Sequence, residues 1–191
     1  MPRGRKAVAS LAGQLLVAMP QMGDPRFERS VIYLCAHSAE GALGLVINRP
    51  FRKLTFPDLL EQLDIERGPD AQQFHVLAGG PVEEGRGFVL HTDDYLRDDT
   101  LKVERGFALT ATIEILKAMA RGEGPARSIL ALGYSGWGPG QLEREITENG
   151  WLHVPADQGL VFDRDLDTKW ERALAKLRVT LASLSGTAGR A

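Results

Sequence analysis

The chain alternates between short, continuous apolar runs and stretches in which apolar residues recur at helical spacing. Residues 30–37 and 42–47 are almost entirely apolar, and a short polar turn containing Gly41 joins them. This pattern is typical of a β-hairpin. Because the runs do not alternate with polar positions, they predict strands that are covered on both faces. Further strands are predicted within residues 13–19, 74–92 (two strands), 99–110, 127–134, 151–155 and 159–162.

Four stretches favour helices, at residues 54–64, 110–122, 139–150 and 167–179. In the first, Thr55 stands three residues before Asp58, which is the spacing of a capping box. In the second, the apolar face is predicted to consist of Ile113, Leu116 and Ala120. The helices are expected to end or begin at glycine, proline and aspartate positions, namely Gly122, Pro139, Gly150 and Asp167.

Hairpin and crossover patterns occur together, so we predict an α/β fold with a layered, mixed sheet and helices on its faces. Residues 11–179 are expected to form one compact domain, with a smaller α+β lobe inserted at about 51–108. Residues 1–10 are expected to be a flexible basic tail, and residues 180–191 a C-terminal tail.

Composition narrows the class of protein. The 191 residues are 43% apolar and 25% charged, with a formal net charge of −2. A dedicated nucleic-acid binder is usually strongly basic, so direct nucleic-acid binding is disfavoured. No apolar run has the length of a membrane span, and Gln14 interrupts the segment that could have been a secretory signal. The only cysteine, Cys35, cannot form a disulfide within the chain, which favours a cytoplasmic protein.

The glycine-rich bend "GYSGWGPG" fits neither a nucleophile elbow nor a dinucleotide-binding fingerprint. A nucleophile elbow requires glycine two residues after the serine, but Trp137 follows Ser135 at that position. A dinucleotide fingerprint would require a third glycine where Gln141 stands. The simpler interpretation is a tight strand-to-helix connection with a tryptophan packed over it.

Cys35 and His37 are two residues apart in a predicted strand, where such residues share a face. A histidine beside a thiol can make it reactive. The alternative is a buried small apolar residue with a histidine at the strand end. No metal site is predicted, because this is the only pair of potential ligands with local ligand-like spacing.

Two further segments could carry function. Asn48 and Arg49 follow a strand, where loops often hold binding residues, although Asn48 could simply close a turn. Gly79 and Gly80 precede a proline in a forced bend. Such a bend can bring backbone N–H groups towards a ligand or can only reverse the chain.

Four long stretches of the chain resemble the AlgH/YqgE family of bacterial proteins. They are "LLVAMPQMGDPRFERSVIYLCAHSAEGALGLVINRP", "GGPVEEGRGFVLHT", "LALGYSGWGPGQLEREITENGWL" and "LSGTAGRA". The resemblance implies a compact cytoplasmic α/β body with a smaller α+β lobe and brings no established biochemical activity. The older family name suggests regulation of transcription, but this chain has neither a helix-turn-helix pattern nor a basic face.

We therefore expect an uncharacterised, non-enzymatic module that binds a small molecule or a protein partner and that affects transcription, if at all, indirectly. No cofactor is expected. The candidate pocket residues are Cys35, His37, Asn48, Arg49, Gly79, Gly80, Tyr134 and Trp137. The alternative is a thiol-dependent enzyme or redox sensor that uses Cys35 and His37. A third hypothesis, direct DNA binding through Arg3, Arg5 and Lys6, is disfavoured by the net charge.

Overall fold

The computed structural model describes residues 9–69, 71 and 75–188. Its strands are β1 (Gln14–Ala18), β2 (Val31–Ser38), β3 (Gly41–Val46), β4 (Val76–Ala78), β5 (Val82–Thr92), β6 (Leu101–Lys102), β7 (Phe107–Thr110), β8 (Ser128–Trp137) and β9 (Trp151–Pro155). Its helices are α1 (Phe56–Gln62), α2 (Ile113–Ala120), α3 (Gln141–Thr147), α4 (Gln158–Val161) and α5 (Lys169–Ala188). Within these described residues, no helix combines the length and the apolar character that crossing a bilayer requires.

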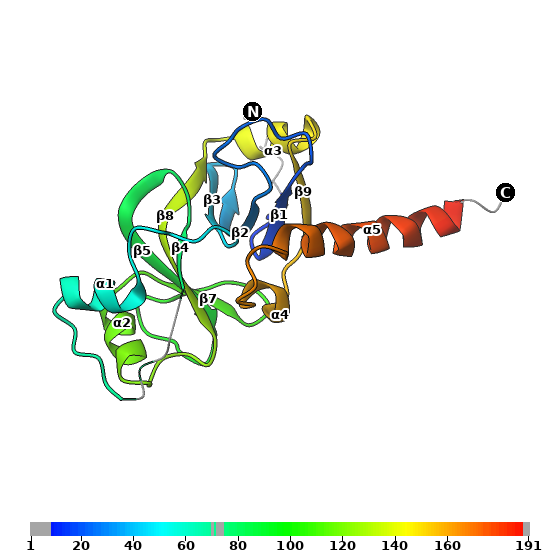
Figure 1. Cartoon of the computed structure of the whole chain (residues 1–191). Coiled ribbons are helices and arrows are strands. Elements are labelled where there is room, and N and C mark those ends of the chain that lie inside the picture. Colours follow the sequence, from blue (N-terminus) through cyan, green and yellow to red (C-terminus); the bar gives the residue numbers. More distant parts are fainter. Residues whose placement is uncertain (1–8, 70, 72–74, 189–191) are drawn as a thin grey trace, which may run out of the picture.

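The strands form one curled sheet in the order β6-β7-β5-β8-β3-β2-β1-β9 (Figure 1). Strand β4 lies off this path and pairs with β8 in parallel, whereas the neighbours along the path are antiparallel. The ten-residue strand β8 joins the two halves, because its first part pairs with β4 and β5 and its last part with β3. The prediction of an α/β fold with a mixed sheet is confirmed.

The sheet is apolar on both faces. In β2, Tyr33 belongs to one core cluster, here called the inner cluster. Its neighbours Ile32 and Leu34 point to the opposite face of the sheet and belong to a second cluster, here called the outer cluster. Helix α3 covers this outer cluster, and helices α1 and α2 cover a third cluster at the other end of the sheet (Figure 1). Helices α4 and α5 pack against the inner cluster. Continuous apolar runs thus form strands with two covered faces, as predicted.

The first helix begins as predicted. The Thr55 side chain accepts a hydrogen bond from the Asp58 N–H, and the Asp58 carboxylate accepts one from the Thr55 N–H. Helix α2 also forms, but Ile113 is 49% exposed, so its assignment to the buried face is wrong. The buried positions begin with Ile115 and Leu116, so the side of the helix that faces the core is turned away from Ile113.

Three further expectations differ from the structure. Residues 159–162 do not form a strand; the Asp157 carboxylate accepts the Leu160 N–H at 2.8 Å and starts the short helix α4 instead. Helix α5 continues to Ala188, through most of the predicted C-terminal tail, and projects from the body (Figure 1). After α3, the residue in the left-handed region is Asn149, with φ of 60°, and not Gly150. Most of the predicted basic tail, residues 1–8, lies outside the described residues.

Candidate functional site

A β-bulge separates Cys35 from His37. Leu34 pairs with Gly44, but Ala36 pairs with Leu43, so that Cys35 is an extra residue in its strand. A bulge of this kind reverses the faces of the residues that follow it. Cys35 therefore lies in the inner cluster, while His37 turns to the outer face beside α3. The expectation that the two side chains share a face is wrong.

Cys35 is in a poor environment for thiol chemistry. The residue is 3% exposed, and burial raises the pKa of its thiol. Its Sγ lies 3.8 Å from the Tyr33 carbonyl oxygen. Because the thiolate is the reactive form, this environment favours an inert core residue over a nucleophile or a redox sensor.

His37 connects the N-terminal segment to α3. Its Nδ1 accepts the Leu11 N–H at 2.9 Å, so the neutral ring carries its proton on Nε2 and donates it to Glu143 Oε1 at 2.5 Å. The His37 hydrogen bond is the main cause of a lowered pKa for Glu143. The His37 side chain is only 2% exposed, and both of its nitrogens are occupied by these contacts.

Asn48 and Arg49 hold the preceding loop in place. Asn48 Oδ1 accepts the Val31 N–H, and Asn48 Nδ2 donates to the Arg29 carbonyl oxygen, both at 2.9 Å. The Arg49 guanidinium donates to the carbonyl oxygens of Arg26 and Glu28. Both side chains thus use their polar atoms within the chain, on the loop that leads into β2.

Gly79 and Gly80 lie where two segments of backbone cross closely. A Cβ at Gly79 would overlap the Gly133 carbonyl oxygen, and one at Gly80 would overlap the carbonyl group of Tyr134. The Gly79 carbonyl oxygen accepts hydrogen bonds from the Val46 N–H and the Ser135 hydroxyl. The bend therefore joins strands β3, β4 and β8 and leaves no room for a ligand there.

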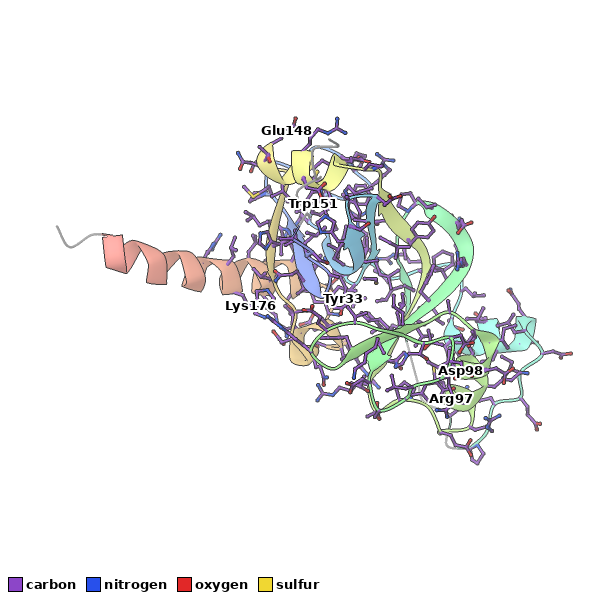
Figure 2. The ribbon with its side chains drawn as sticks, turned by 180° about the vertical axis from the view of Figure 1, so that it is seen from behind. Tyr33, Arg97, Asp98, Glu148, Trp151 and Lys176 are labelled. Carbon is purple, nitrogen blue, oxygen red and sulfur yellow. The ribbon has the colours of Figure 1, made fainter. Side chains whose placement is uncertain are left out.

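The aromatic residues of the glycine-rich bend also pack internally. The Tyr134 ring meets that of Phe88 edge-on at 5.8 Å. The indole N–H groups of Trp137 and Trp151 both donate to Glu145 Oε1, at 3.4 and 3.1 Å. Figure 2 shows Trp151 beneath α3. The bend is therefore a strand-to-helix connection, and two tryptophans beneath it are held by hydrogen bonds to one carboxylate.

A cavity of about 520 Å³ lies elsewhere, and none of the eight predicted pocket residues lines it. It opens between the start of the parallel strands β4 and β8 and the corner that connects α4 to α5. Its lining consists of His75, Leu77, Ala126, Arg127, Ser128, Ile129, Gly159, Phe162, Asp163, Arg164 and Leu166. Cavities of roughly 300–1,000 Å³ are typical small-molecule sites.

Strand alternation explains which side chains reach this cavity. Ile129 and Leu77 belong to the inner cluster, and residues two positions before them, Arg127 and His75, point to the same face. Phe162 and Leu166 pack on that cluster from the opposite wall. The cavity therefore has an apolar floor and polar groups at its edge.

Two arginines at this edge have no acidic partner. Among the described residues, no ion pair or side-chain hydrogen bond is formed by the guanidinium group of Arg127 or Arg164. The acid in the lining, Asp163, is already paired: it accepts the Asp165 N–H at 2.9 Å and lies 2.8 Å from the Arg172 guanidinium. These contacts lower the pKa of Asp163. The remaining charge at the edge is positive.

The backbone that carries Arg127 is fixed by the end of the neighbouring strand β5 and the residues that follow it. The Arg127 N–H donates to Thr92 Oγ1 at 3.2 Å, and the Ala126 N–H donates to Asp94 Oδ2 at 2.9 Å. Thr92 Oγ1 in turn donates to Asp94 Oδ1 at 2.5 Å. The start of β8 therefore holds the arginine on rigid backbone, which suits a preformed binding site.

A buried cation lies behind the α4 wall. Lys169 is 0% exposed, and its Nζ donates to the carbonyl oxygens of Val161, at 2.7 Å, and Ile47, at 3.2 Å. Burial lowers the pKa of this amine to about 8. Because Val161 precedes Phe162 of the lining, the amine anchors this wall to Ile47, the residue that follows β3.

Metal ligation finds no support in the described part of the chain, where no group of three or more His, Cys, Asp or Glu side chains is placed to hold an ion.

Comparison with known proteins assigns the family. A family profile described as AlgH-like matches residues 15–182. The chain belongs to the AlgH-like family. Among its curated relatives, a UPF0301 protein from Afipia carboxidovorans is 56% identical over 189 residues, which cover 95% of this chain and 90% of the relative. One from Methylocella silvestris is 56% identical over 191 residues, covering 96% and 93%.

Solved structures agree with the fold of this AlgH-like chain. The solution structure of AlgH from Pseudomonas aeruginosa has a TM-score of 0.77 and 40% identity, covering 99% of this chain and 100% of that one. The crystal structure of DIP2367 from Corynebacterium diphtheriae has a TM-score of 0.65 and 23% identity, covering 89% and 86%, and supports the fold alone.

The cavity residues of this AlgH-like chain do not form a recognisable sequence motif. They come from three separated segments, around residues 75–77, 126–129 and 159–166. The strand at 127–134 predicts that Arg127 and Ile129 share a face, which is a usable signal. In the third segment, the sequence predicts a strand at residues 159–162 where α4 forms, so it does not predict the approach of this segment to β8.

Proposed function

We propose that this AlgH-like chain is a non-enzymatic binding module whose ligand site is the cavity between the β4–β8 pair and the α4–α5 corner. The observation that carries this proposal is the cavity itself. Its volume of about 520 Å³ suits a small molecule, and its lining combines an apolar floor with charged groups at the edge. The site replaces the recess at the glycine-rich turns that the sequence favours.

The chemistry of the lining supports binding more than catalysis. Cys35 is absent from this lining and buried in the core. The lining has His75, but it lacks a nucleophile–base pair in hydrogen-bond contact, which covalent catalysis needs. In this proposal the protein acts in the cytoplasm, and any effect on transcription is indirect and follows from ligand or partner binding.

The proposal is tested by filling the cavity. Gly159 lines it, has no positive φ, and has only the Asp157 carboxylate within 4 Å of an added Cβ, at 3.3 Å. Gly159→Phe therefore adds a ring at a residue of the cavity lining, with a small adjustment of the Asp157 side chain. Gly23→Phe is the matched control, because a Cβ at Gly23 meets nothing within 4 Å and the residue does not line this cavity.

The measurement is a ¹H–¹⁵N NMR screen with a fragment library that contains neutral, cationic and anionic compounds. We expect binding fragments to shift the amide signals of residues 126–129 and 159–166. Gly159→Phe should abolish these shifts and Gly23→Phe should retain them. Fragments that bind only at other surfaces, or that bind Gly159→Phe unchanged, would overturn the proposal.

A further inference from the structure

We propose that the cavity takes a small organic anion with an apolar, planar body, whose carboxylate or equivalent group is held by Arg127 and Arg164. This inference rests on the proposed function and assigns the chemical class of the ligand. It follows from the distribution of charge and apolar surface around the cavity.

The floor of the cavity fits a planar apolar body. Leu77 and Ile129, both largely buried, lie under the cavity on the strands, and the partly buried Phe162 and Leu166 contribute apolar surface from the α4–α5 corner. Phe162 is only partly buried and presents an aromatic side chain to this space. Aliphatic and aromatic walls on two sides select a ligand with an apolar body, and the affinity then grows with the apolar area that is buried.

The edge of the cavity fits a negative group. Arginine presents a planar fork of N–H donors, which matches the two oxygens of a carboxylate. Arg127 and Arg164 are exposed, and neither guanidinium donates to an acceptor within the described part of the chain. Asp163 would oppose an anion, but the Arg172 guanidinium at 2.8 Å compensates its charge. A cation would find no uncompensated carboxylate in this lining.

The positions of the arginines also favour selective binding. Arg127 directly precedes β8, where Thr92 and Asp94 fix the backbone through hydrogen bonds. Arg164 lies on the connection between α4 and α5, whose two helices are joined through the Lys169–Val161 hydrogen bond of 2.7 Å. Both guanidinium groups are therefore carried by anchored segments, which reduces the entropy lost when they clamp a ligand.

The test compares two probes that share one apolar body, 2-naphthoate and its uncharged counterpart 2-naphthamide, in NMR titrations of the full chain. We expect the carboxylate to bind about ten-fold more tightly, the factor that one charge-assisted contact of about 1.4 kcal/mol supplies. Arg127→Gln and Arg164→Gln should each remove most of this preference and leave naphthamide binding unchanged. Raising the ionic strength should weaken only naphthoate binding.

Arg121→Gln is the matched control, because Arg121 is also exposed but pairs with Glu123 at the end of α2 and lies outside this cavity. Equal binding of the two probes, or a preference that survives both cavity variants, would overturn the assignment of an anion and leave the binding module standing. The absence of binding by both probes would also overturn it. If the fragment screen fails as well, the proposed function fails together with it.

Discussion

Lys169 offers a quantitative test of the folded core. Its side chain is 0% exposed, and its Nζ donates to two carbonyl oxygens, with no carboxylate in contact among the described residues. Burial lowers the pKa of the amine from 10.5 to about 8, although the charge of Asp163 opposes part of the shift. The native state therefore holds this proton less tightly than the unfolded chain does.

The sign and size of the effect on stability follow from this difference. The folded pKa lies below the unfolded pKa, so the unfolded state binds more protons between about pH 8 and pH 10.5. The free energy of unfolding should therefore rise with pH across this window. The difference between 10.5 and about 8, at 1.36 kcal/mol for each pH unit, corresponds to about 3.4 kcal/mol in total, of which roughly 2–3 kcal/mol is gained between pH 7 and pH 10.

The assay is urea unfolding followed by tryptophan fluorescence at pH 7 and pH 10, for the wild-type chain, Lys169→Met and Lys53→Met. Burial also raises the pKa values of Tyr33 and Cys35, but these groups titrate in all three proteins and cancel in the difference. The wild type should gain roughly 2–3 kcal/mol relative to Lys169→Met between the two pH values. Lys53 is exposed, so its variant should follow the wild type.

Parallel stability profiles for the wild type and Lys169→Met would refute the reasoning. They would mean that the amine is hydrated or paired in solution, so that its proton affinity is the same in both states.

Three further predictions concern the core. Gly79→Ala should destabilise the protein by about 3 kcal/mol, because its Cβ would overlap a facing carbonyl oxygen, whereas Gly85→Ala, with nothing within 4 Å, should change stability little; urea unfolding distinguishes the two. Glu145→Ala should lower the free energy of unfolding by about 2–3 kcal/mol and shift tryptophan emission, because two indole N–H groups lose their acceptor. The control Glu148→Ala, at the exposed end of α3, should change neither quantity. Alkylation of Cys35 should be slow in native protein and fast in urea; rapid native labelling at neutral pH would contradict its burial.

Much of the fold could be read from the sequence because local rules decide it. The Thr55–Asp58 capping box starts α1 at the predicted place. The continuous apolar run of β2 became a strand with two covered faces, since every side chain had to be buried on one side or the other. Even the left-handed residue that closes α2, Gly122 with φ of 74°, follows from the lack of a Cβ.

The candidate site depended on contacts that no local pattern contains. The bulge at Cys35 reverses the faces of the β2 residues that follow it. His37 therefore forms a hydrogen bond with Glu143, which lies over a hundred residues away in the sequence. Asn48, Arg49 and the paired glycines have the residue types of a binding loop, yet the fold uses their polar atoms and their small size to join its own strands.

The sequence by itself therefore determined most of the elements, the cap of α1 and the two-sided burial of the sheet, because each depends on residues within a few positions of one another. Only the tertiary structure decided where a cavity is left and which charges face it. Arg127 and Arg164 are 37 positions apart in the numbering. They meet at one cavity only because β8 and the α4–α5 corner pack against the same core. Such a meeting is set by long-range packing and register, and these are properties of the whole fold.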